Sequence, residues 1–350
     1  MIEAAQKTYR AKQWNIRRLL LTVLLATVIW VIVAALCVLV GSTGAIGWPG
    51  DRAFATRLWF RSERVLIASL VGAGLGMAGV VYQAILRNPL ADPYLLGASS
   101  GASLLSIAWL VSMFGSSSTI LFALGQQTAA FIGAILSVAA VLFAASSRGR
   151  IEPVTLILVG VIVNAVNGSF FLLIYSLHPE VVAQGGAFTF LIGGLQSSLS
   201  ARQEWLAAAC VLGGGIALMR ISGLLNVAML QTAEAESLGL NVQRLRWTGL
   251  VIASLVTASV VSISGPIGFI GLVTPHLARM VFGYDQRRLL PIATAFGACL
   301  LALADAASRF LSQQTLMQTE LPVGVLTSLI GGPFFLVLLW RSRESQAETA

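Results

Sequence analysis

Long stretches without a charged residue recur along the whole of this 350-residue chain. One of them runs for 32 residues, from Trp247 to Ala278. A helix needs about 20 apolar residues to cross a bilayer, because the hydrocarbon core is about 30 Å thick. Only 10% of the residues are charged and 57% are apolar, so the charges are too few to cover a soluble globule of this size. We therefore predict an integral membrane protein.

The apolar stretches predict an all-helical fold with about ten membrane spans. The predicted spans are 19–40, 65–86, 94–114, 119–146, 154–178, 203–220, 247–264, 266–283, 289–309 and 321–340. Residues 181–201 are also uncharged, but their paired glycines and serines favour a loop with a short helix. This divides the chain into an N-terminal tail (1–18), one membrane domain (19–340) and a C-terminal tail (341–350), with a large inner loop at 221–246.

The basic residues predict the orientation of the chain in the membrane. An even number of spans puts both termini on one side. If that side is the cytoplasm, 16 of the 22 Lys and Arg residues lie on the inner side and six on the outer side. Positive charge accumulates in inner loops. Both termini are therefore predicted to be cytoplasmic, and the net charge of +8 reflects orientation rather than nucleic-acid binding.

A charged turn interrupts the apolar pattern between the second and third predicted spans. Its sequence is Arg87-Asn88-Pro89-Leu90-Ala91-Asp92-Pro93. Each proline removes a backbone donor, and unpaired polar groups are costly in hydrocarbon. We expect a tight turn that is either in water or buried in protein.

Nucleotide chemistry is not expected from this chain. The pattern Gly74-x-Gly76-x-x-Gly79 matches a dinucleotide fingerprint, but it lies within a predicted span, where small residues let helices approach closely. A phosphate-binding loop needs a lysine, and the only lysines are Lys7 and Lys12 in the N-terminal tail. No metal-ligand cluster or catalytic arrangement is recognisable, so we expect no bound cofactor or metal and consider a membrane enzyme the weakest hypothesis.

Three motifs follow one another in an order that resembles the FecCD-type permeases, the membrane subunits of ABC importers for iron chelates, haem and cobalamin. The first extends from Gln83 to Gly101 and includes the charged turn. The second is Gly265 to Arg279, with Pro275-His276 near its end, and the third is Glu320 to Phe335. Together with the inner loop, the resemblance covers residues 61–340.

The resemblance implies a type II ABC importer permease in a bacterial inner membrane. In this family two copies of the permease form a homodimer around the translocation pathway. Two cytoplasmic ATPase subunits carry ATP and Mg, and a periplasmic binding protein delivers the substrate. The permease itself makes and breaks no covalent bond, and the sequence does not identify which chelate it carries.

Residues 232–239 of the inner loop predict a short helix. Thr232 can cap its start, Glu234 lies in its first turn and Gly239 can end it. The resemblance implies that this helix couples the permease to the ATPase, while an ordinary amphipathic surface helix is the alternative. The implied coupling residues are Glu234, Ala235, Glu236, Ser237, Leu238 and Gly239.

The resemblance further implies a cytoplasmic gate and an outer docking surface. The gate residues are Asn88, Leu90, Pro153 and Val154. The residues expected to dock the binding protein are Arg61, Arg64 and Arg309. Lipid head groups are alternative partners for all three, and Asp305 is an alternative partner for Arg309. Polar residues of the fifth span are candidates for the pathway, namely Asn164, Asn167 and Tyr175.

A proton-coupled secondary transporter is the rival hypothesis. Asp305 is the only carboxylate deep in a predicted span, and ionisable residues inside a membrane are often functional. Arg309 follows four residues later, one helical turn away, so the two side chains can pair on one face. A structural ion pair is the interpretation we favour.

Overall fold

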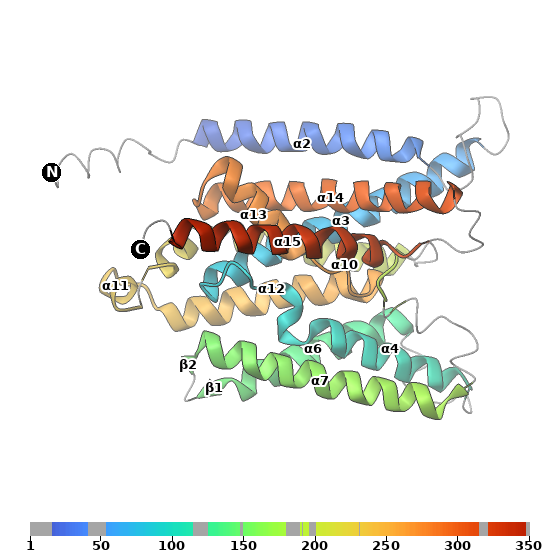
Figure 1. Cartoon of the computed structure of the whole chain (residues 1–350), viewed down its shortest axis with the longest axis horizontal. Coiled ribbons are helices and arrows are strands. Elements are labelled where there is room, and N and C mark those ends of the chain that lie inside the picture. Colours follow the sequence, from blue (N-terminus) through green and yellow to red (C-terminus); the bar gives the residue numbers. More distant parts are fainter. Residues whose placement is uncertain are drawn as a thin grey trace.

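The computed structural model describes residues 16–40, 54–114, 125–147, 150–179, 190, 192–195, 201–230, 232–314 and 321–347. Its elements in chain order are α2 (Ile16–Leu39), α3 (Phe54–Ile85), the 3-10 helix η1 (Pro93–Leu96), α4 (Ala98–Phe114), α6 (Gln126–Ala144), β1 (Ser146–Ser147), β2 (Arg150–Ile151), α7 (Pro153–Leu177), α10 (Ala201–Ala228), α11 (Thr232–Ser237), α12 (Val242–Ser264), α13 (Ile270–Phe282), α14 (Gln286–Gln314) and α15 (Val323–Ala347). Figure 1 shows the long helices side by side in one bundle. The start of α2, the end of α15, α11 and the antiparallel β1–β2 pair all lie at the left end, which is the predicted inner side.

Each predicted span corresponds to a helix in the part of the chain that the structure describes. Among the described residues, seven helices are long and apolar enough to span a membrane: α2, α3, α6, α7, α10, α12 and α14. The apolar segments of α4, α13 and α15 are shorter, at Ala98–Ser112, Ile270–Phe282 and Val323–Val337. Residues 119–124 of the fourth predicted span and most of 181–201 lie outside the described residues.

Several helix ends differ from the predicted bounds, because the bounds were set by the length of each uncharged apolar stretch. Such a stretch shows how much of a helix lies in the hydrocarbon, and the helix itself can continue beyond it. α3 begins at Phe54 rather than 65, and its first turns carry the charged residues that the window excluded. α10 continues past Arg220 to Ala228, and α12 begins at Val242, so much of the predicted loop 221–246 is helical. α15 continues to Ala347, so residues 341–347 are helical rather than a tail.

The chain leaves helical geometry between α12 and α13, where a span starting at residue 266 was predicted. Gly265 has a φ of +65° and Phe269, which caps α13, has a φ of +67°. Left-handed backbone at both positions ends one helix and delays the next, so α13 begins at Ile270.

α3 is the central helix, and its glycines explain how closely its neighbours pack. A Cβ atom added at Gly72 would lie 2.1 Å from the Gly297 carbonyl oxygen on α14, and one at Gly79 would lie 1.8 Å from the Gly271 carbonyl oxygen on α13. Side chains cannot be accommodated at these distances. The packing interpretation of the glycine pattern is therefore confirmed, as expected for helices that meet through small residues.

Candidate functional site

The short helix α11 projects from the left end of the bundle in Figure 1, the end predicted to be cytoplasmic and called the inner end below. Its end is built as the sequence predicts: Gly239 has a φ of +82°, and its N–H donates to the Glu236 carbonyl oxygen at 2.9 Å. Ala235 is fully buried against the bundle, whereas Glu234, Glu236, Ser237 and Leu238 are exposed. The helix thus presents two carboxylates and one leucine outward, a face suited to a protein partner.

The turn that holds the predicted gate residues Asn88 and Leu90, here the first gate turn, is tied to the segment that carries α11. Arg87 adopts a φ of +49°, which is uncommon for a residue with a side chain. Its Nε donates to the Ala228 carbonyl oxygen at 2.9 Å, and its Nη2 donates to Thr232 Oγ1 at 3.4 Å. Asn88 Oδ1 accepts the N–H of Leu90 at 2.9 Å and so fixes the turn. The turn therefore contacts both flanks of the connection between α10 and α11.

The turn before the predicted gate residues Pro153 and Val154, here the second gate turn, is tied to α12, which follows α11 in the chain. Gln243, in the first turn of α12, accepts the N–H of Ile151 at 2.9 Å. Arg246, only 7% exposed, donates from Nη1 to the Ile151 carbonyl oxygen at 3.0 Å. Two residues later Pro153 begins α7, and Val154 is 79% exposed.

These polar links were not predicted from the sequence. Arg87 was recognised only as part of a motif, and Arg246 was counted only as an inner-side charge. Their carbonyl partners are 141 and 95 residues away, respectively, which no local pattern reveals. A hollow of about 720 Å³ lies beside them on the inner face. It is bordered by Arg150, Thr232, Glu236, Gly239, Leu240, Asn241 and Gln243.

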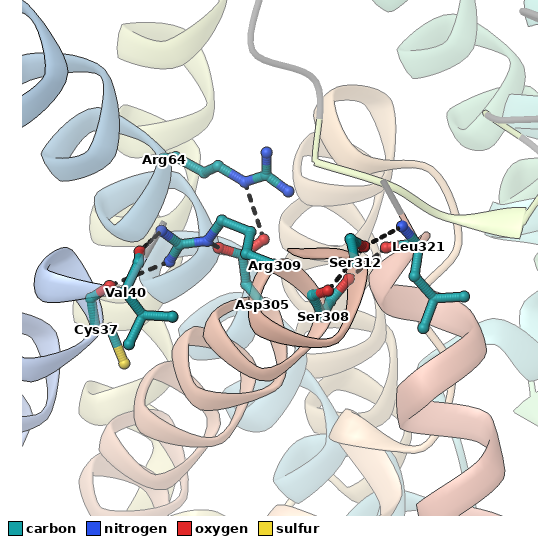
Figure 2. A network of polar contacts seen from close by, with 8 residues as sticks. All are labelled: Cys37, Val40, Arg64, Asp305, Ser308, Arg309, Ser312 and Leu321. Atoms are coloured by element: carbon teal, nitrogen blue, oxygen red, sulfur yellow. Dashed lines mark hydrogen bonds and ion pairs between the residues drawn. The ribbon is translucent and has the colours of Figure 1, made fainter. Parts of the chain in front are cut away.

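At the outer end, the acid of α14 lies between two arginines, as Figure 2 shows. Asp305 is fully buried, with Arg309 Nε 2.9 Å from its Oδ2 and Arg64 Nε 3.0 Å from its Oδ1. The predicted alternative, an ion pair between Asp305 and Arg309, is therefore confirmed. Arg309 also donates to the carbonyl oxygens of Val40 and, at 3.3 Å, Cys37, which end α2. A cation at a helix C-terminus satisfies its last carbonyl groups.

The three arginines expected to dock a binding protein are directed largely into the chain. Arg309 is 2% exposed and Arg61 is 7% exposed, with Arg61 Nη1 donating to the Leu39 carbonyl oxygen at 3.4 Å. Arg64 has the most accessible side chain, at 15%. Direct contact of Arg309 with a partner would require its present bonds to break. Docking at this surface stays a prediction.

Of the three pathway candidates on α7, Asn164 and Asn167 bind neighbouring elements, and Tyr175 contacts another residue of α7. Asn164 Nδ2 donates to the Tyr94 carbonyl oxygen at 3.2 Å. Asn167 Nδ2 donates to the hydroxyl oxygens of Ser100 and Ser137 at 3.1 and 2.8 Å. Tyr175 stacks on Phe171 with ring centroids 6.1 Å apart. These contacts hold α7 to η1, α4 and α6, and a role in substrate passage stays a prediction.

Comparison with known proteins confirms the predicted permease fold. Residues 19–341 match the FecCD transport family. The chain is 38% identical to the hemin transport system permease protein HmuU of Yersinia pestis, over 82% of this chain and 84% of that protein. It is 35% identical to the cobalamin import system permease protein BtuC of Halobacterium salinarum, over 87% of this chain and 82% of that protein. The solved structure of an inward-facing metal-chelate-type ABC transporter superposes with a TM-score of 0.74 at 28% identity, covering 92% of this chain and 99% of that one. The chain therefore belongs to the FecCD transport family.

Proposed function

We propose that this chain is the permease subunit of a binding-protein-dependent ABC importer that moves a large metal chelate into the cell. Haem, a ferric siderophore and cobalamin are the candidate substrates, since the relatives include permeases named for hemin and cobalamin. The observation that carries the proposal is the pair of polar links from the α10–α12 connection to both gate turns.

The proposed mechanism is a mechanical relay. ATP and Mg bind to two separate ATPase subunits, whose closure displaces α11. Arg87 passes this displacement to the turn that holds Asn88 and Leu90, and Gln243 with Arg246 passes it to the turn before Pro153. The two turns then open or close the inner end of the pathway, so that the bundle alternates between inward-open and outward-open states.

A second copy of the chain is proposed to complete the pathway. α7 supports this role because side chains along its length, such as Leu158, Val161 and Leu172, are exposed in a single chain, which leaves them for a neighbour or for lipid. On the outer side, we propose that a periplasmic binding protein docks over the ends of α3 and α14, where Arg61, Arg64 and Arg309 lie. The buried Arg61 and Arg309 would hold the helix ends that form this surface, and the more accessible Arg64 would contact the binding protein.

The geometry of Asp305 disfavours the proton-coupled alternative. A proton carrier must exchange its proton with water along the pathway. Asp305 is fully buried, and each of its carboxylate oxygens lies within 3.0 Å of an arginine Nε, so the carboxylate is shielded from water.

Uptake into proteoliposomes tests the proposal. Vesicles that hold the permease should take up the chelate only when the cognate binding protein, the ATPase subunit and MgATP are all present. Vesicles with an ATPase variant that binds but does not hydrolyse ATP are the matched control and should show no sustained uptake. Uptake driven by a pH gradient without ATP would refute the importer and favour the secondary transporter.

A further inference from the structure

An apolar groove of about 1,060 Å³ runs along the side of the bundle. α2 and α10 form its walls, and buried residues of α3 and α14 form its floor. The wall residues Leu212 and Ile216 are 65% and 60% exposed, so the chain itself does not cover them. The lining residues of the groove extend along α10 from Glu204 to Arg220.

The two ends of the groove carry opposite charge. Glu63 and Glu204 both line the groove at its outer end. Arg220 lies at the inner end, 16 residues along α10 from Glu204, which is about 24 Å at 1.5 Å per residue. The groove therefore extends over most of the hydrocarbon thickness.

A second hollow, of about 660 Å³, continues the groove at its inner end. The two hollows share Met219 and Arg220. Arg287 reaches into the second hollow from α14 and lies flat against α10 at Gly223, where an added Cβ would be 2.9 Å from its Nε. Two guanidinium groups thus border the point where the apolar groove meets the inner membrane surface.

We propose that this groove binds an anionic phospholipid of the inner leaflet. Its phosphate lies between Arg220 and Arg287, and an acyl chain lies along the groove between α2 and α10. Basic pockets between helices on the cytoplasmic side suit anionic head groups, and bidentate arginine suits phosphate. Glu63 and Glu204 at the outer end would repel a phosphate placed there, which disfavours a lipid bound with its head group at the outer end. The lipid would hold α2 against the bundle, because the same chain contacts both walls.

Lipid binding at this groove is independent of the import function, since none of its lining residues belongs to α11 or to the gate turns. Trp30 lines the groove and reports on its occupant. The purified chain is placed in phosphatidylcholine nanodiscs that contain a small fraction of either dibrominated phosphatidylglycerol or dibrominated phosphatidylcholine. Bromine atoms of the lipid quench the fluorescence of nearby tryptophans. The contribution of Trp30 is the difference in quenching between the wild type and Trp30→Phe.

Two pairs of variants separate the head-group site from the acyl-chain site. Arg220→Gln with Arg287→Gln removes the inner-end charge, and Arg150→Gln with Arg244→Gln removes the same charge elsewhere on the inner face. Gly215→Leu fills the groove, since its Cβ would meet only the end of Met77, at 3.4 Å. Gly213→Leu is its control, because nothing lies within 4 Å of a Cβ there.

We expect Trp30 to be quenched preferentially by phosphatidylglycerol. The preference should fall at least about tenfold in the Arg220/Arg287 variant and remain in the Arg150/Arg244 variant. Gly215→Leu should abolish quenching by both lipids, and Gly213→Leu should leave it unchanged. Equal quenching by the two lipids in the wild type would overturn the anionic site. No quenching by either lipid would show that protein, such as a second copy, covers the groove, and would overturn lipid binding altogether.

Discussion

Replacing Asp305 by asparagine removes the one negative charge between two arginines. The distances of 2.9 and 3.0 Å give each ion pair a Coulomb attraction of roughly 5.5 kcal/mol at an effective dielectric constant of about 20, before the cost of desolvation is subtracted. Removing one partner of a buried pair costs about 3–5 kcal/mol, because the remaining charge stays in a medium of low dielectric. Arg309, at 2% exposure, cannot reach water without a change in structure. We therefore expect Asp305→Asn to lower the unfolding temperature by at least about 5 °C.

The loss should begin at the end of α2, where Arg309 holds two carbonyl groups. Cys37 lies in that last turn and is 2% exposed, and the chain has three cysteines in all. In a Cys210→Ala, Cys299→Ala background, the rate at which a thiol reagent labels Cys37 measures how often α2 detaches. Asp305→Asn should increase this rate, and Glu234→Gln, the same change of charge at an exposed site, should not.

A double variant distinguishes an uncompensated charge from a lost contact. Asp305→Asn with Arg309→Gln should be more stable than Asp305→Asn alone by about 1–3 kcal/mol, because the stranded cation is gone and Arg64, partly exposed, can turn toward water. An Asp305→Asn protein with wild-type stability and wild-type Cys37 labelling but no transport would refute this reasoning. It would make the acid a working proton site rather than a structural one.

Two further perturbations test the relay and the packing of the bundle. Arg246→Gln removes a charged hydrogen bond to the Ile151 carbonyl oxygen, which is worth about 1.5–3 kcal/mol. The protein should still assemble, but ATP hydrolysis stimulated by the binding protein, and uptake, should both fall about tenfold or more. Equal rates in Arg246→Gln and in Arg244→Gln, which changes the neighbouring exposed arginine, would contradict the relay. Gly79→Ala should abolish or greatly reduce the yield of monodisperse protein, since the added Cβ would lie 1.8 Å from the Gly271 carbonyl oxygen. Gly168→Ala is the control and should behave as wild type, because nothing lies within 4 Å of a Cβ there. Equal yields of the two variants would show that α3 and α13 can separate at little cost.

The fold was largely predictable, because its determinants are local. The long uncharged stretches of sequence predicted where the helices lie, and Gly239 predicted where α11 ends. The predicted bounds were wrong mainly at helix ends. There the chain is surrounded by water rather than lipid, so a charged residue can belong to the helix and does not mark its end. Arg220 shows the limit: it ended a predicted span, yet α10 continues for eight more residues, and residues 221–228 contain no proline to stop it.

The polar contacts were predictable only where they are close in sequence. Asp305 and Arg309 are four residues apart on one helix, and their pairing was anticipated. Arg64 is 241 residues from Asp305, and its part in the network was not. From sequence alone, an arginine that stabilises a helix end and an arginine that meets a partner look alike. Burial separates them, and burial is a property of the folded bundle.

The links at the inner end have a consequence for how the gate can move. Arg87 holds the first turn to α10 and α11, and Gln243 and Arg246 hold both backbone groups of Ile151 to α12. Breaking either link would leave polar groups unsatisfied in a partly buried site, at about 1–3 kcal/mol for each group. A displacement of α11 is therefore less costly when both turns follow it than when one is left behind. On this basis, the two gate turns of one subunit should open and close together.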